Sequence, residues 1–127
     1  MRRNARESAF KIIYQSLFFD VAEDEIDKYV KEDGLNDDDF VFSKNIINKY
    51  LQNKNEIKAE IEKKLQGYEY NRIYKIDLAL IILALTEVKF LSTAKAIVID
   101  EVIELAKLYS TEKSPKFING ILASILS

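Results

Sequence analysis

Three features of the sequence predict an all-helical fold. Only three glycines and one proline occur among its 127 residues. Apolar residues recur at three- and four-residue spacing, which places them on one face of a helix. No segment shows the sustained apolar–polar alternation that is typical of strands. Because the chain is 48% hydrophobic and long enough to fill one core, we expect a single domain over residues 1–127.

The first half of the sequence contains four helical patterns. A stripe of apolar residues predicts a helix over about residues 4–19. A short helix near residues 23–31 should stop at Gly34, because glycine readily takes the left-handed conformation that ends a helix. Asn36 can then cap a third helix, whose first turn holds three aspartates where the helix dipole favours negative charge. Residues 57, 61 and 65 are apolar at four-residue spacing and predict a fourth helix.

The second half is expected to contain the buried centre of the fold. Residues 76–89 are apolar on nearly all sides, which is typical of a helix that other helices surround. Their longest apolar run, residues 78–85, is shorter than the roughly 20 residues that span a bilayer. An amphipathic helix follows over residues 96–110. A last helix should begin at Ser114 and Pro115, with the serine as its cap and the proline at its first position.

The composition argues against catalysis. The chain has no histidine and no cysteine, so it lacks the side chain best suited to proton transfer near neutral pH and any thiolate. The absence of cysteine also fits a reducing cytoplasm, and the first residues form no apolar secretory signal. A net charge of −2 argues against a protein that coats DNA non-specifically, although it allows a local basic patch.

The stretch "MRRNARESAFK" clusters positive charge at the start of a helix. Each such charge is unfavourable there by about 0.3–1 kcal/mol, because it opposes the helix dipole. The cluster is interpreted either as a solvated, charged helix end or as an anion site, most naturally for nucleic-acid phosphate.

The stretch "STEKSPKFING", residues 110–120, combines two lysines, an aromatic ring and an amide at a helix start. Lys113 and Lys116 could neutralise phosphates, and Asn119 could read a base edge in single-stranded RNA. Phe117 could stack on a base, or it could be an ordinary core residue. Nearby carboxylates at residues 100, 101 and 104 have no further metal ligand converging on them in sequence, so we interpret them as a solvated surface cluster and expect no metal site.

Three blocks together are similar to one known family. They are "RRNARESAFKIIYQ", "GYEYNRIYKIDLALIILALTEV" and "IVIDEVIELAKLYSTEKSPKFING", and they occur in the family's order. Over nearly its whole length the chain resembles the NusB transcription antitermination factors. The resemblance implies a compact fold of seven helices in two small packed bundles, without a cofactor or a catalytic activity. It also implies binding to the small-subunit ribosomal protein NusE and, with it, to a boxA element in nascent RNA, so that RNA polymerase reads through terminators in ribosomal RNA operons.

The resemblance assigns roles residue by residue. The RNA-facing positions of the family correspond here to Arg2, Arg3, Arg6, Lys116, Phe117 and Asn119. The positions associated with function at the RNA and partner surface correspond to Tyr14 and Asp77. Lys113 stands where the family commonly has an acid, which should favour RNA.

Some positions depart from the family's pattern. Leu78 and Ile82 replace usual basic side chains, which removes polar contacts expected there. Ser110 replaces a usual glycine, so the turn after it is expected to have a different shape. Two other functions remain open: an accessory module in ribosomal RNA modification, and a helical interaction protein that never binds RNA, which the acidic net charge favours.

Overall fold

The computed structural model describes residues 2–65 and 67–127, and over these residues the chain forms seven α-helices, one short 3₁₀ helix and no strand. The helices are α1 Arg2–Ser16, α2 Glu23–Glu32, α3 Asp37–Gln52, α4 Lys54–Lys64, α5 Lys75–Leu91, α6 Lys95–Tyr109 and α7 Ser114–Ile125. The 3₁₀ helix η1 spans Tyr70–Arg72. The prediction of an all-helical fold is therefore confirmed.

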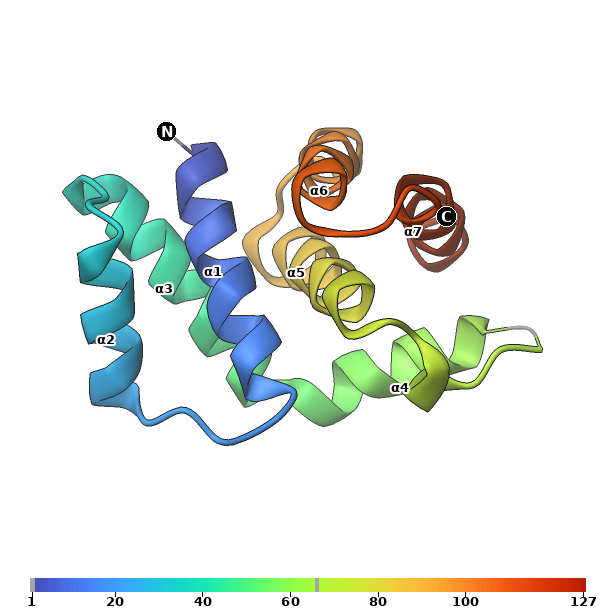
Figure 1. The fold of residues 1–127 in the computed structure, drawn as a ribbon, viewed down its shortest axis with the longest axis horizontal. Coiled ribbons are helices and arrows are strands. Elements are labelled where there is room, and N and C mark those ends of the chain that lie inside the picture. The colour runs from blue at the N-terminus through green and yellow to red at the C-terminus, as the bar shows by residue number, and fades with distance from the viewer. Residues whose placement is uncertain (1, 66) are drawn as a thin grey trace.

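The helices form two packed groups that share α5 (Figure 1). In one group, α1, α2 and α3 pack against one another. In the other, α6 and α7 pack against each other and against α5, and α4 contacts α7. Because α1 and α3 also lie against α5, this helix joins the two groups. The predicted arrangement of two small bundles is confirmed.

The central helix α5 is buried along most of its length. All residues from 77 to 87 are buried, which explains why the sequence there is apolar on every side. Leu78 and Ile82, which replace the family's usual basic side chains, are core residues here. This chain therefore uses those two positions for packing and has no polar contact to offer from them.

The ends of α1 differ from the predicted ones. The helix begins at Arg2 rather than near residue 4, and the Arg2 guanidinium reaches α3, where it donates to the Asp38 carbonyl oxygen at 3.3 Å. It ends at Ser16 rather than near residue 19. There the Ser16 hydroxyl donates to the carbonyl oxygen of Ile13 at 2.6 Å, a local bond that competes with the helical ladder.

The predicted cap at Asn36 and helix end at Gly34 are confirmed. The Asn36 side chain accepts from the Asp39 amide at 2.8 Å and caps α3. Gly34 has a φ of 69°, the left-handed conformation that favours glycine. Among the described residues, no helix combines the length and the apolar character needed to cross a bilayer.

We predict that Leu83→Ala lowers the free energy of unfolding by about 2–5 kcal/mol, because Leu83 is fully buried in α5 and its truncation leaves a cavity. Denaturant unfolding measures the loss. The matched control is Leu108→Ala on α6, where the side chain is 70% exposed, and this variant should stay within about 0.5 kcal/mol of the parent. Equal stability of the two variants would contradict the central position of α5.

Candidate nucleic-acid interface

The first turns of α1 direct their arginines to two different neighbours. Residues four apart share a helix face, so Arg2 and Arg6 both point toward α3, where their guanidinium carbons lie 4.2 Å and 5.4 Å from the centre of the Phe42 ring. Arg3 and Glu7 share the next face and point toward α6. The helical repeat thus places Arg2 and Arg6 on one face of α1 and Arg3 on another.

Arg6 has an internal role that the sequence did not indicate. Its side chain is buried and donates from Nε and Nη2 to the carboxylate of Glu87 on α5, at 2.8 Å and 2.5 Å. Burial alone lowers the pKa of Arg6, but the hydrogen bonds and charge of Glu87 outweigh it and raise the pKa above its usual value. Arg6 is therefore a permanent cation that is neutralised inside the protein, and it does not share the exposed surface of Arg2 and Arg3.

Arg2 and Arg3 are exposed. Arg3 donates from Nε to Glu101 Oε2 on α6 at 3.0 Å, and this hydrogen bond raises its pKa further. Arg2 lies 3.5 Å from Asp39 Oδ1. The pair of Arg3 with the partly exposed Glu101 is weak, so a phosphate oxygen can replace that carboxylate, whereas the Asp39 carboxylate that faces Arg2 is buried. Each of the two arginine side chains is about half exposed and remains open to an incoming anion.

The start of α7 presents the second group of predicted residues. Lys113, Lys116 and Asn119 are exposed. Phe117 is half-buried, packs against the core and touches the ring of Tyr68, with 5.4 Å between the ring centres. The structure therefore brings Lys113, Lys116 and Asn119 to one exposed helix end and gives Phe117 a largely structural position.

Ser114 does not cap α7 as predicted. The N-cap residue is Lys113, and the Ser114 hydroxyl points away from the helix and donates to Asp77 Oδ2 on α5 at 3.0 Å. Ser110 donates to the other carboxylate oxygen of Asp77, and its hydroxyl also lies 2.8 Å from that of Ser114. The prediction failed because Ser114 is itself the first residue of the helix, and its hydroxyl oxygen accepts a hydrogen bond from the Thr111 amide at 3.1 Å.

Asp77, which was expected at the RNA and partner surface, is only 5% exposed. One of its oxygens accepts from Ser110 in the turn after α6 and the other from Ser114, the first residue of α7, so its role in this structure is to hold the start of α7 against α5. Ser110 has φ −117° and ψ −161°, an extended conformation open to any residue. The replacement of the family's glycine therefore causes no backbone strain and supplies one of the two bonds to Asp77.

Tyr14 belongs to a row of aromatic rings along α1 and the turn that follows it. Its ring lies between Phe10, 6.4 Å away, and Phe18, 5.1 Å away, and Phe10 also touches Tyr109 on α6 at 5.2 Å. Burial, followed by a hydrogen bond to Glu7, raises the pKa of Tyr109 to about 12, so its hydroxyl stays neutral and ties α6 to α1. Phe18 is exposed, which leaves an apolar end of the row open to a partner.

Two of the three acids in the cluster on α6 form ion pairs. Glu101 pairs with Arg3, and Glu104 with Lys107 at 3.3 Å. Over residues 2–65 and 67–127, no three histidine, cysteine, aspartate or glutamate side chains are grouped so that they could hold a metal ion.

Comparison with known proteins gives one consistent family. A sequence model of the NusB family matches residues 3–127. The Transcription antitermination protein NusB of Finegoldia magna is 36% identical over 98% of this chain and 93% of its own length. The protein of the same description from Listeria monocytogenes is 38% identical over 98% of this chain and 94% of its own length.

Solved structures agree. A chain in the crystal structure of antitermination factors NusB and NusE in complex with dsRNA matches with a TM-score of 0.87, at 28% identity, over 98% of this chain and 94% of that one. T. maritima NusB matches with a TM-score of 0.85, at 31% identity, over 98% of this chain and 89% of that one.

We predict that Glu87→Gln destabilises the protein by about 3–5 kcal/mol, because it leaves the buried Arg6 guanidinium without a counter-charge. The double variant Arg6→Met/Glu87→Leu should recover most of this loss, since apolar residues of similar volume often replace a buried ion pair at little cost. Thermal or denaturant unfolding measures both. Glu101→Gln, at the exposed pair with Arg3, is the control and should unfold like the parent. A Glu87→Gln variant as stable as this control would show that the pair is not buried as described.

Proposed function

Because the chain belongs to the NusB family, we propose that it is an RNA-binding transcription antitermination factor that acts together with a NusE-type small-subunit ribosomal protein. The match to a chain in the NusB–NusE–dsRNA complex supports this assignment. The family role is binding rather than catalysis, and the protein is not an enzyme. We propose boxA-type RNA as its ligand, the RNA polymerase antitermination complex as its setting and the cytoplasm as its location.

The observation that carries the proposal is the position of two exposed basic elements on either side of α6. Arg3 at the start of α1 reaches Glu101 in the middle of α6, and Glu7 one turn later accepts from Tyr109 at the end of α6. The turn that follows Tyr109 leads directly to Lys113 and the start of α7. One strand of RNA crossing α6 can therefore meet both elements.

Each element suits a different part of an RNA strand. Arg2 and Arg3 are exposed guanidinium groups, which bind phosphate through two parallel hydrogen bonds. Lys113 and Lys116 supply two further cations, and the Asn119 amide can both donate to and accept from a base edge. The net charge of −2 is compatible with this role, because three acids near α1 and α6, Asp39, Glu101 and Glu104, are paired with cations.

The aromatic row of α1 is the proposed contact for the protein partner. Tyr14 is half-buried, and the exposed Phe18 ring extends it outward. Aromatic side chains of this kind are enriched at protein interfaces. We retain Tyr14 as a partner-binding residue and assign Asp77 to the support of α7.

We predict that the double variant Arg2→Gln/Arg3→Gln weakens binding of the partner-loaded protein to boxA-type RNA and lowers the slope of log affinity against log salt. Each lost phosphate contact should reduce that slope by about 0.7 on a single strand. Fluorescence anisotropy over a salt series measures both quantities.

The matched control for these arginines is Lys28→Gln/Lys31→Gln, which removes two exposed charges from α2, a helix that Figure 1 shows well separated from α7. It should bind with the affinity and slope of the parent. If the arginine variant behaves like this control, the start of α1 is not an RNA contact. If the parent itself binds no RNA with or without the partner, the proposed function is wrong.

We further predict that Lys116→Ala and Asn119→Ala weaken RNA binding and leave the melting temperature equal to that of the parent. Both side chains are exposed, and within the part of the chain that the structure describes neither forms a side-chain hydrogen bond. Parental RNA affinity in both variants would contradict the assignment of these residues.

A further inference from the structure

Tyr68 is an exposed aromatic residue next to the start of α7. It lies in the segment between α4 and η1, and its side chain is 48% exposed. Its ring touches that of Phe117, with the ring centres 5.4 Å apart and the planes tilted by 42°. Nothing in the local sequence indicates this contact, because the two rings are almost fifty residues apart.

The two rings differ in what they can still bind. Phe117 is half-buried and packs against the core, so most of its surface is already covered. Tyr68 covers it further and has about half of its own surface free. Of the pair, Tyr68 therefore presents the more accessible aromatic surface, and Phe117 fixes its position.

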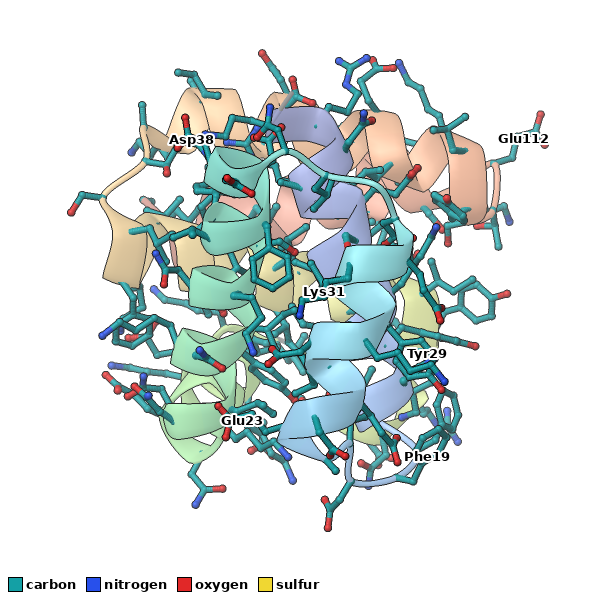
Figure 2. All side chains as sticks on the ribbon, turned by 90° about the vertical axis from the view of Figure 1, so that its left-hand side faces the viewer. Phe19, Glu23, Tyr29, Lys31, Asp38 and Glu112 are labelled. Carbon is teal, nitrogen blue, oxygen red and sulfur yellow. The ribbon has the colours of Figure 1, made fainter. Side chains whose placement is uncertain are left out.

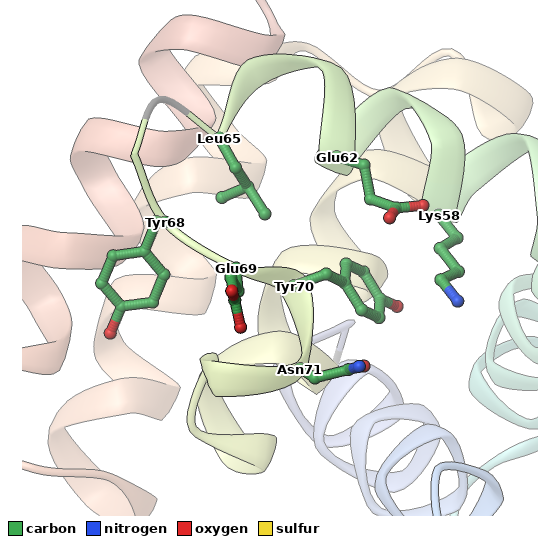
Figure 3. A pocket seen from close by; sticks show the side chains of 7 residues that line it. All are labelled: Lys58, Glu62, Leu65, Tyr68, Glu69, Tyr70 and Asn71. Carbon is green, nitrogen blue, oxygen red and sulfur yellow. The ribbon is translucent and has the colours of Figure 1, made fainter.

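A cavity of about 300 Å³ opens beside Tyr68, between α4 and the segment that leads into η1 (Figure 3). Tyr68 lies at one end of it and Lys58 at the other, with Glu62, Glu69 and Asn71 along its walls. The volume is at the lower limit of small-ligand sites, which suits a single nucleobase.

We propose that Tyr68 is the base-stacking platform of the α7 edge and that the cavity beside it receives the edge of the same unstacked base. This inference rests on the proposed RNA-binding function and adds a subsite to it. Base–aromatic stacking is the usual way in which proteins hold unpaired RNA bases, and it needs an aromatic surface open to solvent. Lys113 and Lys116 lie on the neighbouring helix start, where they can hold the sugar–phosphate backbone.

The lining of the cavity favours a base over a phosphate. Glu62 and Glu69 bring two carboxylates, which repel phosphate and accept hydrogen bonds from the N–H groups of a base. Burial, with the nearby Tyr50 and Glu62, raises the pKa of Tyr70 to about 12, so its hydroxyl adds no charge at neutral pH. Lys58 lies with its ammonium group 5.1 Å from the Tyr70 ring, which closes the far end of the cavity.

Fluorescence provides a direct test, because the chain contains no tryptophan. In the variant Tyr68→Trp, the single indole should be quenched when the partner-loaded protein binds boxA-type RNA, since a base stacks on it. The control is Tyr29→Trp on α2, which is also exposed but lies far from α7 (Figure 2) and should not respond. Quenching by the ribosomal partner alone, with no further change on adding RNA, would make Tyr68 a protein contact and overturn the proposal.

Affinity measurements complete the test. Tyr68→Ala should bind RNA about 5- to 150-fold more weakly, the effect of removing one base–aromatic stack. Tyr68→Leu keeps an apolar contact with Phe117 and should preserve the melting temperature while losing the same affinity. An abasic residue placed at one position of the RNA at a time should identify one base whose removal weakens binding to the parent but not to Tyr68→Leu.

The outcomes separate this inference from the proposed function. If Tyr68→Leu binds RNA like the parent while Arg2→Gln/Arg3→Gln binds weakly, the RNA function stands and the Tyr68 subsite is wrong. If every abasic position weakens the parent and Tyr68→Leu equally, no base stacks on Tyr68 and the proposal fails. If the parent binds no RNA, the proposed RNA-binding function is wrong, and the Tyr68 subsite is wrong with it.

Discussion

The ion pair between Arg6 and Glu87 is the contact on which the arrangement of α1 depends. It joins the first helix to the central one across 81 residues of sequence, and both side chains are buried. A buried pair of this kind adds little net stability compared with apolar packing, but it is costly to break, so it fixes one orientation of α1. Because residues four apart share a face, the pair of Arg6 with Glu87 also keeps Arg2 on the side of Arg6, where both guanidinium groups lie near the Phe42 ring of α3, and turns Arg3 toward α6. The internal arginine thereby positions the two external ones.

A second buried acid of α5 positions the other basic element. Asp77 binds Ser110 and Ser114 and holds the start of α7, whereas Glu87 holds α1. The two acids are ten residues apart on one helix, which corresponds to about 15 Å along its axis. A rigid, fully packed helix therefore sets the distance between the two surfaces proposed to bind RNA. This explains why Asp77 and Glu87 occur in an otherwise apolar helix: they connect α5 to the starts of α7 and α1, which carry the residues proposed to bind RNA.

Much of the fold could be predicted from the sequence because local patterns determine it. Three features that were predicted correctly depend only on nearby residues. They are the apolar character of residues 77–87, the cap formed by Asn36 and the helix end at Gly34. The failures involve partners that are distant in sequence. No local signal shows which of three arginines meets Glu87, that Ser114 is bound by Asp77 instead of capping its own helix, or that Tyr68 lies on Phe117. The sequence therefore could not show which of the predicted site residues are buried and which are exposed.

The most direct test of this division is a nuclear magnetic resonance titration of the arginine side chains. The chain has only four arginines, so their Nε–Hε signals can be resolved and assigned individually. When RNA is added to the partner-loaded protein, the Arg3 signal should shift as its guanidinium leaves Glu101 for phosphate, and the Arg6 signal should stay in place because Glu87 retains it. A shift of the Arg6 signal with an unchanged Arg3 signal would contradict the account, since the buried pair would then be the RNA contact and not its support.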